Sequence, residues 1–195
     1  MSKLQYYIFH KPYNVLSQFT KEVPEHITLQ DFLDLPGDVY PVGRLDKDSE
    51  GLLLLTNDNR LKNNLLDPNS DSTKTYLVQV DGAIDKDAIR QLRNGVSIKL
   101  KKGYYTTLPC KVKSVLNPNV EERNPPVRFR ANIPTSWIEI TITEGKNRQI
   151  RKMCAAVGFP CLRLIRTAIK EVQFKDLKPG TFRTITTEEF RLLAR

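Results

Sequence analysis

Apolar and polar positions along the chain predict a mixture of strands and helices that do not alternate regularly. The clearest strand signals are the unbroken apolar run Leu52–Thr56 and the strict alternation of Lys74–Val80, where Tyr76, Val78 and Val80 share one face. The remaining strand-like runs are Leu4–His10, Val39–Val42, Thr107–Val115, Trp137–Thr143, Cys161–Ile169 and Phe182–Ile185.

Helices are predicted where capping residues precede apolar positions spaced three and four apart. Asp58, Asp85 and Thr186 each precede such a segment, and the first two helices end at Asp67-Pro68-Asn69 and Asn94-Gly95. A further helix is predicted from Asn147 to Val157. The irregular order of strands and helices predicts an α+β fold rather than a doubly wound sheet.

In the predicted helix over 147–157, apolar residues recur at i, i+3, i+4 and i+7. The same spacing places Arg148, Arg151 and Lys152 on one face of its first two turns. Cations there oppose the helix dipole and one another, so the sequence predicts an anion beside them, either a phosphate or a buried carboxylate. A solvated basic face is the alternative.

The chain has 195 residues and a formal net charge of +9. Between Arg123 and Lys170 the acids are Glu139 and Glu144 alone, against a large excess of Lys and Arg. A basic segment of this kind is typical of a nucleic-acid contact surface. A membrane-surface patch is the weaker alternative, because the basic residues lie among prolines and strand-like runs rather than on one amphipathic helix.

Other features exclude several classes of protein. The sequence has no apolar run long enough to cross a membrane and no signal peptide core, so we expect a cytoplasmic protein. Cys110, Cys154 and Cys161 lack metal-binding or disulfide spacing, and His10 and His26 are the only imidazoles. We therefore expect no metal site, and each cysteine is read as a small buried side chain.

A polar loop between two apolar strands, 43–51, concentrates three carboxylates: Asp46, Asp48 and Glu50. A calcium loop fits poorly, because Asn57 stands where a bidentate Glu is required. A glycosidase pair is disfavoured since residues two apart in a loop rarely face each other across a sugar. A solvated acidic turn remains an alternative to a catalytic loop.

This loop carries a resemblance to a known family. The run Gly43-Arg44-Leu45-Asp46, followed by Ser49 and by Gly51 through Asp58, resembles the catalytic-aspartate motif of the pseudouridine synthases, in the branch typified by the small-subunit rRNA enzyme. Further segments agree in order, so the resemblance covers about Leu4 to Ile185. They are Lys11-Pro12 with Val15-Leu16-Ser17, Lys74-x-Tyr76-x-Val78, Glu144 through Met153, and Leu162-x-Leu164-x-Arg166.

Two stretches, Arg123–Pro126 and Ile133–Trp137, are similar to the subgroup that modifies 23S rRNA. The branch commonly carries an N-terminal S4-type RNA-binding domain, whereas here the catalytic core starts almost at Met1. Asn14 stands where many relatives have Gly, a residue that also tolerates left-handed turns. The resemblance thus implies a single catalytic domain over 1–195, built as a mixed, mainly antiparallel sheet with flanking helices, in two abutting subdomains with a central basic cleft.

The resemblance also implies roles for individual residues. Asp46 is the expected nucleophile in a reaction that breaks a C–N glycosidic bond and rejoins the base through carbon, with no metal or organic cofactor. Arg151 is expected to keep Asp46 ionised, with Arg148 as the alternative. Tyr76 is expected to stack on the uracil and to act as a late base, and Leu164 to line the apolar side of the pocket. Without the motif, Tyr76 would be read as an ordinary cross-strand aromatic residue and Leu164 as plain core.

The uridine must be flipped out of its helix, at a cost that backbone contacts offset. We expect an RNA partner and no membrane, with the protein acting as a monomer. Tyr13, Phe129 and Trp137 are candidates for stacking on bases, and the alternative function is a catalytically silent RNA-binding or ribosome-assembly module. The expected phosphate contacts are Arg44, Arg123, Arg128, Arg130, Lys146, Arg148, Lys152 and Arg166.

Overall fold

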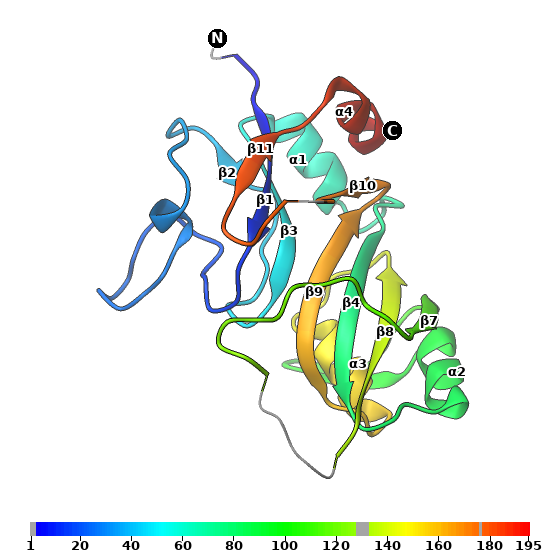
Figure 1. The fold of residues 1–195 in the computed structure, drawn as a ribbon. Helices are drawn as coiled ribbons and strands as arrows, with labels where there is room; N and C mark the ends of the chain where they lie inside the picture. Colours follow the sequence, from blue (N-terminus) through cyan, green and yellow to red (C-terminus); the bar gives the residue numbers. More distant parts are fainter. Residues whose placement is uncertain (1–2, 128–132, 176) are drawn as a thin grey trace. The chain divides into compact units, whose positions relative to one another are not determined.

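The computed structural model describes residues 3–127, 133–175 and 177–195. It divides into two compact units (Figure 1). Unit 1 consists of Met1–Ser72 and Ile165–Arg195, and unit 2 of Thr73–Leu164. Strand β9 (Cys161–Ile169) begins in unit 2 and ends in unit 1. In the described ranges, no helix is long and apolar enough to span a bilayer.

The sheet of unit 1 is built around β3 (Glu50–Thr56), whose residues are all buried. Strand β3 pairs antiparallel with β1 (Tyr6–Lys11) and β2 (Tyr40–Pro41), and in parallel with β9. Strand β11 (Phe182–Thr184) extends the sheet beyond β1, and β10 (Val172–Gln173) pairs with β9. The unbroken apolar run of β3 is explained by burial on both faces.

Two apolar clusters cover the two faces of β3. Leu52 and Leu54 pack with residues of α1 (Asn59–Leu66) and α4 (Thr187–Ala194), which lie beside each other in Figure 1. Leu53 and Leu55 pack with the segment that includes the 3₁₀ helix η1 (Leu29–Asp31). The side chain of Asp58 accepts hydrogen bonds from two backbone amides at the start of α1, as its predicted cap requires.

In unit 2, β4 (Lys74–Asp81), β8 (Thr135–Ile142) and β7 (Lys111–Val115) form an antiparallel sheet. One face carries the core cluster, which α2 (Lys86–Asn94) and α3 (Gln149–Ala156) complete. The opposite face carries polar side chains, among them Thr75 and Thr141, whose hydroxyls form a hydrogen bond of 2.9 Å. The predicted α+β, mainly antiparallel fold is therefore confirmed.

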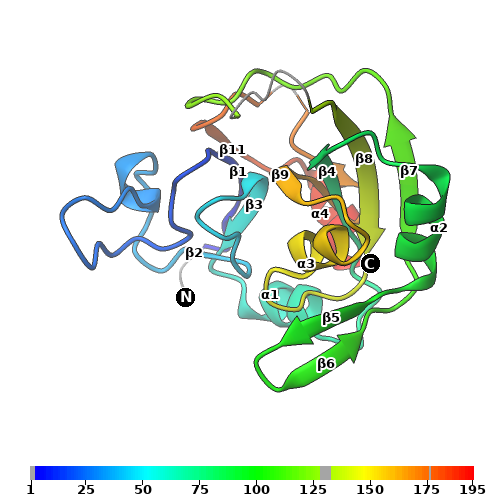
Figure 2. The same cartoon turned by 90° about the horizontal axis from the view of Figure 1, so that it is seen from below.

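Strands β5 (Ser97–Leu100) and β6 (Gly103–Thr106) form a separate two-stranded sheet in unit 2 (Figure 2). We predicted no hairpin there and expected a strand over 107–115. The structure corrects this prediction, since the third strand of the region, β7, begins only at Lys111.

The helix predicted from Asn147 begins later than expected. Arg148 is its N-cap, with a left-handed backbone (φ 52°), and helical geometry starts at Gln149. The prediction that Arg148 shares a helix face with Arg151 and Lys152 is therefore wrong. The apolar periodicity begins at Ile150, so it does not constrain the backbone of residue 148.

Candidate active site

The loop that carries Asp46 belongs to unit 1 and is anchored by the segment that follows β1. The Ser17 hydroxyl bridges both backbone groups of Leu45, because it donates to the carbonyl oxygen (2.8 Å) and accepts from the amide (3.1 Å). The amide of Asn14 donates to the carbonyl oxygen of Lys47 (2.8 Å). Asp46 thus lies between two backbone positions fixed by residues far away in the sequence.

Asn14 makes its contact from a left-handed backbone (φ 65°). This conformation suits asparagine, which with glycine adopts it more readily than other residues do. The turn directs the Asn14 amide at the loop, and the departure from the family pattern changes little.

Lys11 is the most deeply buried charged group of this site, with 0% of its surface exposed. Its ammonium group donates to the carbonyl oxygens of Pro12 (2.9 Å) and Val15 (2.6 Å) and lies 3.5 Å from that of Lys47. Burial lowers the pKa of Lys11 to about 7, although Glu50, Asp48 and Asp46 raise it by their negative charge. The lysine side chain therefore ties the end of β1 to the Asp46 loop.

The loop is not a solvated acidic turn. Glu50 is 3% exposed and Ser49 is 2% exposed, whereas Asp46 and Asp48 are half-buried. The calcium interpretation gains no support, because the described residues contain no cluster of His, Cys, Asp or Glu that could hold a metal ion. Asp46 is thus a partly accessible carboxylate on a rigid support.

Gly51 closes the loop onto β9. Its backbone is left-handed (φ 100°), and a Cβ there would lie 2.3 Å from the carbonyl oxygen of Arg166, its partner in the parallel β3–β9 pair. Only glycine fits this close approach. The glycine of the motif therefore sets the distance between the Asp46 loop and β9.

Arg166 contributes to this support. Its side chain is 5% exposed, and Nε donates to the carbonyl oxygen of Leu52 (2.8 Å). Its Nη2 is buried without a hydrogen-bond partner among the described residues. This burial gives no support to the phosphate contact predicted for Arg166, which stays a prediction.

The other predicted catalytic side chains lie in unit 2. Tyr76 is half-buried on β4, and Leu164 is 6% exposed within the core cluster of this unit. Arg151, in the first turn of α3, is half-buried and donates from Nη1 to the Cys161 sulfur (3.5 Å). Arg148 is exposed. The half-buried environment favours Arg151 over Arg148 as a residue held in one orientation.

The loop between β8 and α3 is organised by a residue to which we assigned no role, Glu144. Its carboxylate accepts from the Tyr105 hydroxyl (2.6 Å), the Leu108 amide (2.9 Å) and the Gln149 side chain. Gln149 in turn accepts from the Lys146 amide (2.9 Å). A signal for this role existed, because Glu144 is one of the two acids in the basic segment between Arg123 and Lys170.

The remaining predicted RNA contacts differ in exposure. Arg44 and Lys146 are exposed, and Lys152 is half-buried. Arg123 is half-buried and donates to the carbonyl oxygens of Pro125 and Pro126. Arg128, Arg130 and Phe129 lie outside the described residues, whereas Trp137 and Tyr13 are half-buried.

The cysteines match their prediction in part. Cys154 is fully buried, which raises the pKa of its thiol, and Cys110 and Cys161 are only partly buried. All three are free thiols.

Comparison with known proteins agrees with these motifs. A family model described as RNA pseudouridylate synthase matches residues 5–156. The chain is 53% identical over 178 residues to "Ribosomal large subunit pseudouridine synthase E" of Vibrio parahaemolyticus, covering 91% of this chain and 72% of that protein. It is 48% identical to the protein of the same name from Xanthomonas axonopodis, covering 88% of this chain and 89% of the relative.

Solved structures of pseudouridylate synthases have a similar fold. A structure titled "Crystal structure of pseudouridylate synthase" superimposes with a TM-score of 0.81 at 26% identity, covering 99% of this chain and 75% of the other. Human RNA Pseudouridylate Synthase Domain Containing 1 shares the fold, with a TM-score of 0.56 at 16% identity, covering 97% of this chain and 91% of the human one. The chain belongs to the RNA pseudouridylate synthase family.

Proposed function

We propose that this protein isomerises a specific uridine of 23S rRNA to pseudouridine, with Asp46 as the nucleophile. One observation supports 23S rRNA as the substrate. Over about nine-tenths of its length, the chain is identical at about half of the aligned positions to relatives named for the large ribosomal subunit. The rigid, partly accessible Asp46 loop supports the role of the carboxylate.

The chemistry is balanced within one substrate. The bond between N1 and C1′ breaks, a bond between C5 and C1′ forms, the proton on C5 leaves and N1 gains one. No electrons enter or leave, so the reaction consumes no redox cofactor. The carboxylate of Asp46 supplies the nucleophilic step, because it can attack the substrate without first losing a proton.

We assign the supporting roles as follows. Arg151 keeps Asp46 ionised, Tyr76 stacks on the uracil and takes the C5 proton, and Leu164 excludes water from the base. An rRNA substrate implies a cytoplasmic enzyme, and the proposal includes a monomeric active form. Each role rests on the motif positions and on the chemistry the residue type can supply.

The test is an incubation of unmodified 23S rRNA and, separately, of unmodified 16S rRNA with wild-type protein, Asp46→Asn and Asp48→Asn, followed by measurement of RNA binding and mapping of pseudouridine at every uridine. We expect one new site with the wild-type protein and with Asp48→Asn, and a loss of at least about a thousandfold in rate with Asp46→Asn, as for removal of a nucleophile. Asp48→Asn is the matched control, because it removes the same charge two residues away.

Each alternative outcome is informative. Turnover retained by Asp46→Asn would exclude this residue as the nucleophile. A site in 16S rRNA and none in 23S would keep the enzyme and reject the substrate. Binding of rRNA by the wild-type protein without any isomerisation would favour a silent RNA-binding module.

A further inference from the structure

The hairpin β5–β6 of unit 2 has two chemically distinct faces. In its register Ile98 pairs with Tyr105, and Lys99 pairs with Tyr104. Directly paired residues point to the same side of a sheet, and neighbouring pairs point to opposite sides. One face therefore carries Ile98 and Tyr105, and the other carries Lys99 and Tyr104.

The inner face is fixed to the rest of unit 2. Ile98 is 2% exposed within the core cluster, and Tyr105 packs against that cluster. The Tyr105 hydroxyl donates to Glu144, which raises the pKa of the tyrosine, and the ammonium group of Lys146 lies 5.0 Å from the centre of its ring. The hairpin is thus held to the loop that precedes α3.

The outer face and the turn are basic and aromatic. Tyr104 is 80% exposed, and Lys99, Lys101 and Lys102 are exposed around it. The hairpin segment Ser97–Thr106 contains no acid. The side chains of these four residues, here called the hairpin patch, form no hydrogen bond or ion pair with the described part of the chain.

Edge protection explains only part of this composition. Lysines on an edge strand and its turn discourage pairing with another chain, and here Lys99 is on β5 while Lys101 and Lys102 form the turn. A tyrosine that served only to stabilise the hairpin would be covered by its cross-strand neighbour, yet Tyr104 leaves most of its ring in water. An uncovered aromatic ring among three cations is the arrangement that binds unpaired nucleotides, by stacking and by phosphate contact.

We infer that the hairpin patch is an RNA-binding surface that holds an unpaired nucleotide of the substrate RNA on Tyr104 and its phosphates on Lys99, Lys101 and Lys102. The inference rests on the proposed function and extends it to residues outside the family motifs. Tyr105 joins the hairpin to the loop of the exposed Lys146 through its contacts with Glu144 and Lys146, so a nucleotide held on the patch restricts where the rest of the RNA lies.

The test measures binding of unmodified 23S rRNA to hairpin variants over a range of KCl concentrations. Tyr104→Ala should weaken binding about tenfold, whereas Tyr104→Trp should bind as the wild-type protein does. Combined Lys99→Ala, Lys101→Ala and Lys102→Ala should reduce the slope of log K against log [salt] by about 2.

Matched controls are Tyr40→Ala, which removes an exposed tyrosine of unit 1, and Lys86→Ala, which removes an exposed lysine of α2. Both should bind RNA as the wild-type protein does. Tyr104 is exposed, so its truncation leaves the core intact, and thermal unfolding of each variant confirms this.

The outcomes separate the two proposals. Hairpin variants with wild-type affinity and salt slope, in a protein that modifies rRNA, would overturn the inference and leave the function standing. Weakened RNA binding by the variants, with no pseudouridine formed by the wild-type protein, would keep the patch and reject the function.

Discussion

At the scale of single residues, the positions that organise the Asp46 loop are buried polar groups with several partners. Ser17 and Lys11 each contact the loop backbone, and both stand in the first segment of the family resemblance. Their place in that segment could be read from the sequence, but their roles could not. A hydrogen bond between residues so far apart in the chain depends on the packing of β1 against β3.

The buried Lys11 makes stability depend on pH. Its pKa is about 7 in the folded protein and about 10.5 in the unfolded chain, so between these values the unfolded chain binds the additional proton. Stability should therefore fall as the pH decreases from 10.5 to 7, by up to about 1.4 kcal/mol per pH unit, and this contribution should be constant below that range.

Urea unfolding of the wild-type protein, Lys11→Met and Lys47→Met between pH 7 and pH 10.5 checks this prediction. Lys11→Met should remove the slope, and Lys47→Met, which changes an exposed lysine of the same loop, should keep it. If the free energy of unfolding changed with pH in the same way for the wild-type protein and Lys11→Met, the buried ammonium group would not titrate in this range.

At the scale of elements, residues whose signal is local were predicted well. Asp58, Asp85 and Thr186 cap helices as expected, and β9 has the predicted bounds. The β5–β6 hairpin was missed because its turn, Lys101-Lys102, lacks the residues that usually mark a hairpin and its alternation lasts only four residues a strand. Arg148 was misplaced because its backbone is set by the loop before α3.

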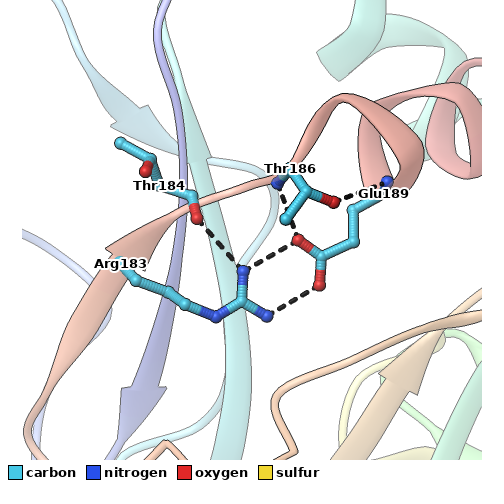
Figure 3. A network of polar contacts seen from close by, with 4 residues as sticks. All are labelled: Arg183, Thr184, Thr186 and Glu189. Carbon is cyan, nitrogen blue, oxygen red and sulfur yellow. Dashed lines mark hydrogen bonds and ion pairs between the residues drawn. The ribbon is translucent and has the colours of Figure 1, made fainter.

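The helix α4 is held by one polar network (Figure 3). Arg183 forms a two-pronged ion pair with Glu189 (2.7 and 2.8 Å), and Glu189 also accepts from the amide of Thr186 (2.8 Å). The Thr186 hydroxyl accepts from the Glu189 amide (3.1 Å) and completes a capping box. Leu193, which is 1% exposed, packs the helix into the core of unit 1.

This network should make α4 sensitive to acid. The hydrogen bond from Arg183 lowers the pKa of Glu189 from 4.5 to about 2, against the effect of burial. Its contribution to stability is complete above pH 4.5 and is lost as the pH falls through 2. Glu189→Gln should lower the free energy of unfolding by about 1 kcal/mol at neutral pH and by less in acid.

Glu188→Gln is the matched control, because Glu188 is an exposed acid in the same helical turn. Chemical unfolding at neutral and acidic pH measures both variants. Equal effects of the two substitutions would mean that the general charge of the turn, and not the Arg183 pair, stabilises α4.

At the scale of the whole molecule, the positive charge belongs to one unit. Unit 2 carries 17 Lys and Arg against 7 Asp and Glu, a net charge of +10, whereas unit 1 carries 14 against 15. The sequence showed the excess between Arg123 and Lys170 but not its extension to the lysines of the hairpin. That extension needed the division of the chain into units, which is a property of packing.

The same division has a consequence for how the protein is made. Unit 2 is one continuous stretch of chain, and all members of its core cluster lie between Val78 and Leu164. Unit 1 consists of two segments, one before unit 2 in the sequence and one after it. Its core cluster that includes residues of α1 is complete only when Ile169, Val172 and Leu193 have been synthesised, near the end of translation.

Unit 2 should therefore become resistant to protease while the chain is still on the ribosome. Unit 1 should become resistant only after both of its segments have been synthesised. Nascent chains arrested after Leu164 has left the exit tunnel would show a protected fragment from unit 2, whereas protection around α1 would require the C-terminal residues as well. The basic unit 2 is thus expected to fold first, at the moment when the nearest RNA is that of the ribosome synthesising the chain.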